Sequence, residues 1–335
     1  MRRQGERRGV LLLNLGTPDA PETGAVRRYL REFLMDGRVL DIPTPARWIL
    51  VNLLITPTRS PKSAKAYRAV WLKDGSPLLV YSRAIVSAVE KELGEHVTLA
   101  MRYGNPSIEA AIAELGEVDR IVVVPLYPQY ASSSTGTALE ALFAALSKRA
   151  FVPPVSVLPP FFDDPGFLDA QAALARPMVA GADHVLFSYH SLPERHIKAA
   201  SSTCELTTRC CVPGSGKVPP YCYRAQCLAT TRGLVSRLGL AEGAFSESFQ
   251  SRLGREEWLK PATDKVVPEL ARRGVKRLTV VCPSFVADCL ETLEEIGIRA
   301  REEFLAAGGE ELRLVPCLNG DPTFAAALAR RIAEL

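Results

Sequence analysis

The sequence has no long apolar run. No stretch approaches the ~20 consecutive apolar residues that a membrane-spanning helix requires. The basic start of the chain is followed by the short apolar run 10–13 and then by Asn14 and Gly16, a pattern typical of a buried strand and not of a secretory signal. We therefore expect a cytoplasmic protein.

Charge of one sign is also scarce. The formal net charge is +4 and the basic residues are dispersed, which argues against a nucleic-acid partner, because such partners select clustered lysine and arginine. Hydrophobic residues make up 47% and charged residues 23%, as in an ordinary soluble protein. The length of 335 residues allows two domains.

Histidine is rare, whereas cysteine is concentrated. The chain has four histidines and eight cysteines, and five of the cysteines lie between Cys204 and Cys227. In a reducing compartment such crowding favours a metal site over disulfides. Paired CxxC sequences, typical of zinc ribbons, are absent. Cys282 and Cys317 each lie in an apolar run and are expected to be packing residues.

Eight short apolar runs alternate with amphipathic segments. Most of the runs are almost continuously apolar, which is typical of parallel strands covered by helices on both faces. The alternation predicts an α/β fold of doubly wound type. The predicted strands are residues 9–15, 97–103, 120–126, 155–158, 184–189, 245–250, 277–282 and 312–317, and the helical segments include 25–33, 78–93, 135–149 and 291–307.

Two sets of four strands predict two similar lobes. We place the N-terminal lobe at residues 1–165 and the C-terminal lobe at 166–335, with a cysteine-rich insertion at 201–224. Ligands of such sheets bind beyond the carboxyl ends of the strands. Polar and aromatic residues follow the predicted strands at these ends, so a ligand cleft is expected there.

One apolar segment lies outside this pattern. Residues 48–55 are nearly all apolar and stand between prolines. They can form a core helix, or an apolar lip over a flat hydrophobic ligand that touches a membrane surface. The sequence leaves both interpretations open.

Candidate catalytic side chains stand at two strand ends. His190 ends the strand that precedes Ser191-Leu192-Pro193, where an imidazole suits proton transfer, although a single strand-end histidine is more often structural. Asp288, Glu291 and Glu295 are spaced i, i+3 and i+7, so we expect them to share one helix face suited to a divalent cation or a proton relay. The alternative is a solvated first turn that complements the helix dipole, which we favour for Glu294.

Seven segments, in chain order, resemble the signatures of ferrochelatases. They extend over almost the whole chain: GVLLLNLGTP (9–18), AMRYGNPSI (100–108), PLYPQYASSSTGT (125–137), SYHSLPE (188–194), SFQSRLGREEWLKP (248–261), FVADCLETLEE (285–295) and VPCLN (315–319). The resemblance implies two Rossmann-like lobes, each a parallel sheet flanked by helices, with a porphyrin-sized cleft between them. It also implies insertion of Fe(II) into a porphyrin with release of two protons, the last step of haem biosynthesis. The DCLETLEE sequence (288–295) favours protoporphyrin IX, and coproporphyrin stays open as the alternative substrate.

The resemblance assigns roles to individual residues. His190 is the implied metal ligand or base, Glu291 is the catalytic glutamate, and Asp288 and Glu295 continue an acidic path for iron. We expect an imidazole from one lobe and an acidic helix from the other to face each other across the cleft. The implied porphyrin-binding residues are Arg102, Tyr103, Tyr130, Ser132, Ser133, Trp258 and Phe285.

The cysteine-rich insertion resembles the internal iron–sulfur segment of some bacterial ferrochelatases. The resemblance implies a 2Fe–2S cluster, with zinc or free thiols as alternatives. The four implied ligands are Cys204, Cys210, Cys211 and Cys222. Cys227 stands where the wider family often has a cysteine without a cluster. Cys289 replaces a histidine of some members and is interpreted as a packing residue.

The implied partners are the porphyrin and ferrous iron. Peripheral contact with the inner face of the membrane, or with the preceding porphyrin-synthesis enzyme, is also an expectation. Two other readings stay open: a chelatase for another metal or tetrapyrrole, and a haem-binding protein that has lost the reaction.

Overall fold

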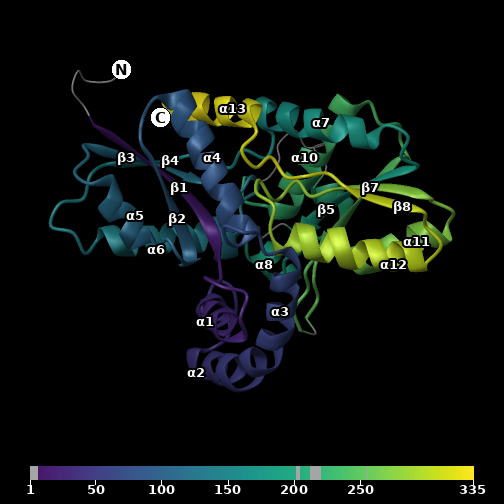
Figure 1. Ribbon diagram of the computed structural model, residues 1–335, viewed down its shortest axis with the longest axis horizontal. Coiled ribbons are helices and arrows are strands. Elements are labelled where there is room, and N and C mark those ends of the chain that lie inside the picture. Colours follow the sequence, from purple (N-terminus) through teal and green to yellow (C-terminus); the bar gives the residue numbers. More distant parts are fainter. Residues whose placement is uncertain (1–6, 201–203, 212–219, 255) are drawn as a thin grey trace. The chain divides into compact units, whose positions relative to one another are not determined.

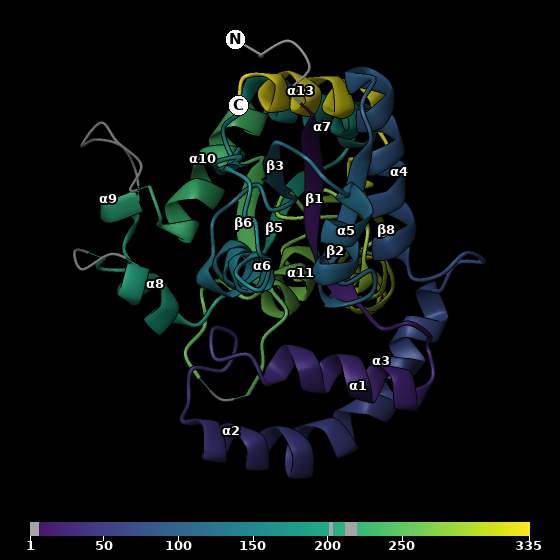
Figure 2. The same ribbon diagram turned by 90° about the vertical axis from the view of Figure 1, so that its left-hand side faces the viewer.

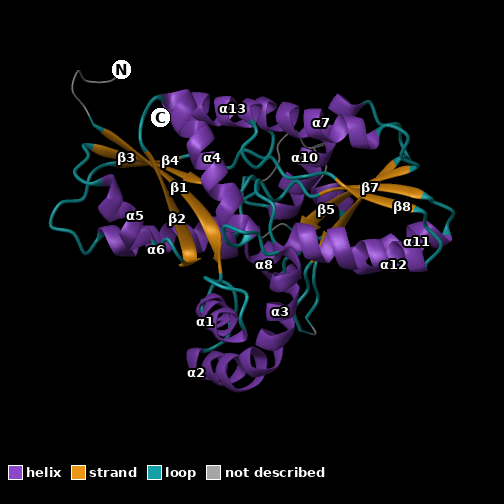
Figure 3. Ribbon diagram, in the orientation of Figure 1, coloured by secondary structure: helices purple, strands orange, loops and turns teal. Residues whose placement is uncertain are grey.

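The computed structural model describes residues 7–200, 204–211, 220–254 and 256–335. It confirms the α/β fold: two four-stranded parallel sheets are each flanked by helices (Figure 1, Figure 3). All eight predicted strands are present, with bounds that differ by three residues or fewer. Parts of the cysteine-rich insertion, residues 201–203 and 212–219, lie outside the described residues.

The first sheet has the strand order β2-β1-β3-β4. Its central strand β1 is buried because its apolar run packs on both faces. The strands are β1 Arg8–Thr17, β2 Val97–Gly104, β3 Arg120–Pro125 and β4 Val155–Val157. On one face Leu11, Leu13 and Val123, all fully buried, pack against helices α5 Ile108–Leu115 and α6 Thr137–Leu146.

The second sheet repeats this topology in the order β6-β5-β7-β8. Its strands are β5 His184–His190, β6 Phe245–Gln250, β7 Arg277–Val281 and β8 Glu311–Leu314. Leu186, Val280 and Phe304 are fully buried in the core on one face, beside α11 Thr263–Arg272 and α12 Arg301–Ala306. The unit also holds α7 Pro165–Val179, α8 Glu194–Ala200, α9 Thr208–Cys211, α10 Tyr223–Leu238 and the π-helix η4 Glu291–Ala300.

This strand order determines where each sheet can bind a ligand. The chain leaves the first strand to one side and returns to the third strand on its other side, so a crevice opens at the carboxyl ends of these two strands. In the second sheet the two strands are β5 and β7, which are hydrogen-bonded neighbours. His190 ends β5, and Ser284 follows β7 by three residues, so the fold places both at this crevice.

The chain divides into two compact units. The first runs to Tyr127 and includes Ser132–Pro160 and Asn319–Leu335, and the second holds Pro128–Ala131 and Phe161–Leu318. The last helix, α13 Pro322–Ala333, therefore belongs to the first unit, whereas the sequence-based division placed it in the C-terminal lobe. It packs against α4 Pro77–Leu93, and its apolar residues, such as Leu328, are buried.

The apolar segment between the prolines is largely exposed. It forms α2 Thr44–Ile49 and the π-helical turn η1 Leu50–Ile55, which continue into α3 Thr56–Val70. With α1 Thr23–Leu34 these helices extend beyond the carboxyl ends of β1 and β2 (Figure 2). Val51 is fully buried, but Trp48, Ile49, Leu53 and Leu54 are 47–59% exposed, so the segment is a surface feature and not a core helix.

Across the described ranges, no helix combines the length and the apolar character that crossing a bilayer would require.

Candidate active site

The backbone of His190 is held on both sides at the end of β5. Its N–H donates to the Ser284 hydroxyl oxygen (3.1 Å), and its carbonyl oxygen accepts from the Tyr223 hydroxyl (2.8 Å). The ring of His190 stands edge-on to Phe285, with 6.2 Å between ring centroids. The strand end, the loop after β7 and the first turn of α10 together orient the imidazole.

The surroundings of His190 favour the neutral ring. Burial lowers the pKa of His190, and the charge of Glu291 opposes that effect. A neutral imidazole has a free nitrogen lone pair, which can accept a proton or bind a metal ion. Glu291 stabilises the imidazolium that forms if the ring takes up a proton. The pair can therefore serve as a base with a built-in counter-charge.

His190 and Glu291 both belong to the second unit, so the expectation that they come from different lobes is wrong. Strands β5 and β7 are neighbours in one parallel sheet, and the chain reaches the acidic helix directly after β7. The carboxyl ends of both strands therefore bring the imidazole and the acid to the same edge.

The acidic helix is not the regular α-helix that the sequence predicts. Residues Glu291–Ala300 form a π-helix, and only Arg301–Ala306 continue as an α-helix. Such π-helical segments are uncommon and are frequent at functional sites. Asp288 precedes the helix, so it does not share a helix face with Glu291 and Glu295 as the i, i+3, i+7 spacing predicted.

Asp288 is buried and hydrogen-bonded inside the second unit. It is 3% exposed, and its two carboxylate oxygens accept from the Thr292 hydroxyl (2.9 Å) and from the Cys317 N–H (3.2 Å). The Thr292 hydroxyl oxygen also accepts from the Cys289 N–H (3.0 Å). These contacts fix the turn that leads into the π-helix.

The start of the π-helix is tied to the ends of β5 and β6. The Gln250 amide donates to the main-chain oxygen of Glu291 (2.8 Å), and the Gln250 side-chain oxygen accepts from the Ser188 hydroxyl (2.6 Å). Both Gln250 and Ser188 are buried. This buried chain of hydrogen bonds positions Glu291 relative to His190.

Glu295 lies one π-helical turn beyond Glu291 and can hold a proton. Its carboxylate accepts from the N–H (3.0 Å) and the hydroxyl (2.5 Å) of Ser251, and Arg299 lies 3.9 Å away. Burial raises the pKa of Glu295, and Ser251 and Arg299 only partly oppose it. Glu294 lies in the first turn of this helix, as expected. It pairs with Arg299 at 2.9 Å and its side chain is only 13% exposed, so it is not the solvated residue that the sequence predicted.

In the first unit, a carboxylate that the sequence did not reveal organises the end of β2. Asp36 Oδ2 accepts hydrogen bonds from Arg102 (2.6 Å), from the Tyr103 hydroxyl (2.9 Å) and from the Thr137 hydroxyl. The Thr137 hydroxyl oxygen in turn accepts from Arg102 Nε (2.8 Å). The guanidinium of Arg102 lies 4.4 Å from the ring centroid of Tyr103, a cation–π geometry. Arg102 and Tyr103 therefore lie together, as expected, but both side chains bind the carboxylate of Asp36.

The pKa of Asp36 is lowered. Burial raises it, but the hydrogen bonds from Thr137, from the Arg38 backbone and from Tyr103, together with the charge of Arg102, outweigh burial. No sequence signal marked Asp36, because an acid just after a helix also suits an ordinary turn. Asp36 gains its structural role only in the folded chain, where Arg102 lies beside it.

The other predicted porphyrin-binding residues are distributed over both units. Ser132 and Ser133 begin the π-helical turn η2 Ser132–Gly136 of the first unit, where the Ser132 hydroxyl accepts from Arg38 (2.9 Å). In the second unit, the N–H of Tyr130 donates to Gln226 (2.6 Å), and the half-buried indole of Trp258 donates to the Leu253 carbonyl (3.1 Å).

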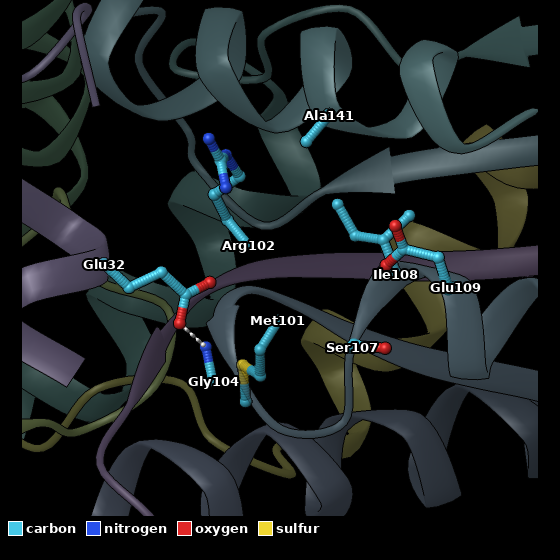
Figure 4. A pocket seen from close by; sticks show the side chains of 8 residues that line it. All are labelled: Glu32, Met101, Arg102, Gly104, Ser107, Ile108, Glu109 and Ala141. Carbon is cyan, nitrogen blue, oxygen red and sulfur yellow. Dashed lines mark hydrogen bonds between the residues drawn. The ribbon is translucent and has the colours of Figure 1, made fainter. Parts of the chain in front are cut away.

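A small polar pocket adjoins Arg102 in the first unit. Figure 4 shows Glu32 reaching the Gly104 N–H, a contact of 3.1 Å, near the Arg102 side chain. The pocket has a volume of about 170 Å³. That is well below the ~300–1,000 Å³ of drug-sized ligand sites, so the pocket is too small for a porphyrin. Its lining residues are Glu32, Met101, Arg102, Gly104, Ser107, Ile108, Glu109 and Ala141.

The four thiols of the insertion interact with one another. The sulfurs of Cys210 and Cys211 lie 3.9 Å apart, and Arg224 donates to the sulfur of Cys211 (3.1 Å). A hydrogen bond to Cys222 and burial raise the pKa of Cys211, whereas the same hydrogen bond lowers that of Cys222. Burial and the neighbouring thiols raise the pKa of Cys204. The set has the donor chemistry of an iron–sulfur or zinc site.

The four thiols have the right chemistry for a metal site, but they are not arranged as a metal site in this structure. Within the part of the chain that is described, no three or more His, Cys, Asp or Glu side chains are arranged to hold a metal ion. The remaining cysteines, Cys227, Cys282, Cys289 and Cys317, are buried, and burial raises the pKa of each.

The fold resembles that of a solved bacterial protein. SirB from Bacillus subtilis, solved with Fe3+, superposes with a TM-score of 0.53 at 13% identity, covering 98% of this chain and 95% of SirB. The fold is thus the chelatase-like one of two repeated parallel sheets.

The sequence comparisons are more specific. The ferrochelatase family model matches residues 7–335. A ferrochelatase of Azotobacter vinelandii is 50% identical over 328 residues, which cover 96% of this chain and 97% of that protein. A ferrochelatase of Legionella pneumophila (strain Lens) is 46% identical over 331 residues, which cover 98% of this chain and 99% of that protein. The chain belongs to the ferrochelatase family.

Proposed function

We propose that the protein inserts Fe(II) into protoporphyrin IX, giving protohaem and two protons as the last step of haem biosynthesis. The observation that carries the proposal is the pair His190–Glu291 at the sheet crevice, in a chain of the ferrochelatase family. A chelatase for another metal, or a haem-binding protein without the reaction, remains as an outcome of the test.

The reaction needs a base held against a flat macrocycle. His190 accepts a pyrrole N–H proton at its neutral ring, and Glu291 stabilises the resulting imidazolium. Glu295, whose pKa is raised, then accepts a proton on its way out of the site. Asp288 holds the turn that positions this π-helix, and it can contribute to the acidic path only if its own hydrogen bonds open. Iron takes the place of the two departing protons.

Each unit, taken by itself, carries candidate side chains for contact with a porphyrin. We assign the aromatic walls to Tyr130, Trp258 and Phe285, because flat apolar ligands bind against such side chains. The ring of Tyr103 is fully buried, so the expectation that it contacts the porphyrin is wrong. Ser132 and Ser133 supply hydroxyl groups. Arg102 is bound to Asp36 and therefore acts as a fixed positive charge beside the ring of Tyr103.

The direct test is an anaerobic insertion assay with Fe(II) and protoporphyrin IX, repeated with Co(II) and with coproporphyrin. Turnover that is highest with Fe(II) and protoporphyrin supports the proposal. Preference for Co(II) or coproporphyrin identifies a related chelatase, and porphyrin or haem binding without turnover identifies a non-catalytic protein.

We further propose that Cys204, Cys210, Cys211 and Cys222 hold a 2Fe–2S cluster, with zinc as the competing occupant. Support comes from the donor set, which consists of four mutually interacting thiols in one segment. Iron and sulfide analysis with an absorption spectrum of anaerobically purified protein tests this. A colourless, iron-free preparation that inserts iron at full rate contradicts the cluster.

The exposed apolar surface of Trp48, Ile49, Leu53 and Leu54 supports peripheral contact of a cytoplasmic protein with the inner membrane face. Replacing Leu53 and Leu54 together by glutamate should reduce cosedimentation with phospholipid vesicles. If vesicle binding is unchanged but binding to the preceding porphyrin-synthesis enzyme is lost, the surface serves that protein instead.

A further inference from the structure

The first turn of α10 lies between the thiols of the insertion and His190. Cys222 is the residue that caps this helix, and its carbonyl oxygen accepts the N–H of Gln226 (3.0 Å), the first hydrogen bond of the helix. Tyr223 and Arg224 follow at once. Three consecutive residues therefore belong to one hydrogen-bonded turn, which moves as a unit.

Tyr223 connects this turn to the imidazole-bearing strand end. Its hydroxyl donates to the carbonyl oxygen of His190 (2.8 Å), and the residue is 6% exposed. The N–H of the same histidine is held by Ser284 (3.1 Å). Removing the Tyr223 hydroxyl would leave the carbonyl of His190 without this donor in a buried setting, where an unmade hydrogen bond is costly.

Arg224 and Cys222 connect the same turn to the insertion. Arg224 donates to the sulfur of Cys211 (3.1 Å) and to the carbonyl oxygen of Thr207 (3.0 Å). Cys211 and Cys222 are both buried and interact through their thiols. A change at either sulfur therefore acts on the residues immediately before and after Tyr223.

We propose that Tyr223 is a positioning residue that couples the thiols of Cys211 and Cys222 to the orientation of His190. The coupling passes through one hydrogen bond, from the phenol to the main chain of the histidine. The kinetic part of this inference rests on the proposed iron insertion, whereas the structural part does not.

The test compares Tyr223→Phe with Tyr221→Phe. Tyr221 is two residues away and 58% exposed, so the same loss of a hydroxyl group at that position is a matched control for the substitution itself. In Tyr223→Phe we expect kcat for iron insertion to fall about tenfold with KM for porphyrin nearly unchanged, the size typical of a lost outer-shell contact. The chain has four histidines, so the ring resonance of His190 can be followed by NMR while the other three report on folding.

A second comparison tests the coupling itself. Cys211→Ser and Cys222→Ser should each shift the His190 resonance in the otherwise native chain, and should cause no further shift in the Tyr223→Phe background. The inference is overturned if Tyr223→Phe matches Tyr221→Phe in both kcat and the His190 resonance, or if the serine variants shift that resonance equally in both backgrounds. If the native chain itself inserts no iron, the proposed function is wrong. The His190 resonance then still shows whether the thiols are coupled to His190 through Tyr223.

Discussion

Replacing Asp36 by asparagine isolates the acid around which the end of β2 is built. The side chain of Asp36 is 8% exposed and that of Arg102 is 21% exposed, so the pair is mostly withdrawn from water. The substitution keeps the volume but removes the charge that Arg102, Tyr103 and Thr137 share. Breaking a buried pair costs about 3–5 kcal/mol, and the partial exposure of Arg102 places the expected loss at about 3 kcal/mol.

The pH dependence of this loss has a defined sign. The pKa of Asp36 is lowered in the folded protein from its ordinary value of 3.8, so the carboxylate stabilises the fold above that pH. The stabilisation falls away as the pH drops through the folded-state pKa. The difference between the native chain and Asp36→Asn should thus be full at neutral pH and shrink in acid below about pH 4.

Urea unfolding followed by circular dichroism measures this difference. Asp169→Asn is the matched control, because Asp169 pairs with Arg237 at the same 2.6 Å but is 62% exposed. Exposed pairs contribute about 0–1 kcal/mol, so the control should be nearly silent. Equal losses in the two variants, or a gap for Asp36→Asn that widens in acid, would refute the reasoning.

Further predictions concern the acidic helix and its neighbours. Glu291→Gln should lower the pKa of His190 further, because it removes the charge that opposes burial, and an unchanged or higher value in an NMR titration would contradict this. Ser251→Ala should raise the pKa of Glu295 further by removing a hydrogen bond to its carboxylate, and the pH profile of kcat should move to higher pH on its acidic side. An unmoved profile would remove Glu295 from the proton path.

The sequence predicted the sheets well because their signal is local. Each strand is a short, nearly continuous apolar run, and a run of this kind indicates a buried parallel strand whatever packs on it. The position of His190 at a strand end followed from the same signal, and the structure places it at the crevice between β5 and β7.

The π-helix could not be predicted in the same way. The spacing of Asp288, Glu291 and Glu295 was read with an α-helical period, which is the usual period for an amphipathic segment. The actual winding depends on partners that are distant in the sequence, such as the Gln250 amide on the main chain of Glu291, 41 residues away. No local pattern records such a partner.

Asp36 was missed for a related reason. Its partners Arg102, Tyr103 and Thr137 are separated from it by 66, 67 and 101 residues. The signature around Arg102 suggested a residue that meets the substrate directly, whereas the guanidinium is bound to an acid of its own unit. Only the fold brings a turn after α1 to the end of β2.

The proposed function depends above all on His190, which accepts a pyrrole N–H proton in the field of the Glu291 charge. The most direct measurement is porphyrin affinity and iron insertion side by side for His190→Ala, under anaerobic conditions. We predict that protoporphyrin binding persists, as seen by fluorescence quenching, while insertion is lost. Insertion at a near-native rate in this variant would contradict the account.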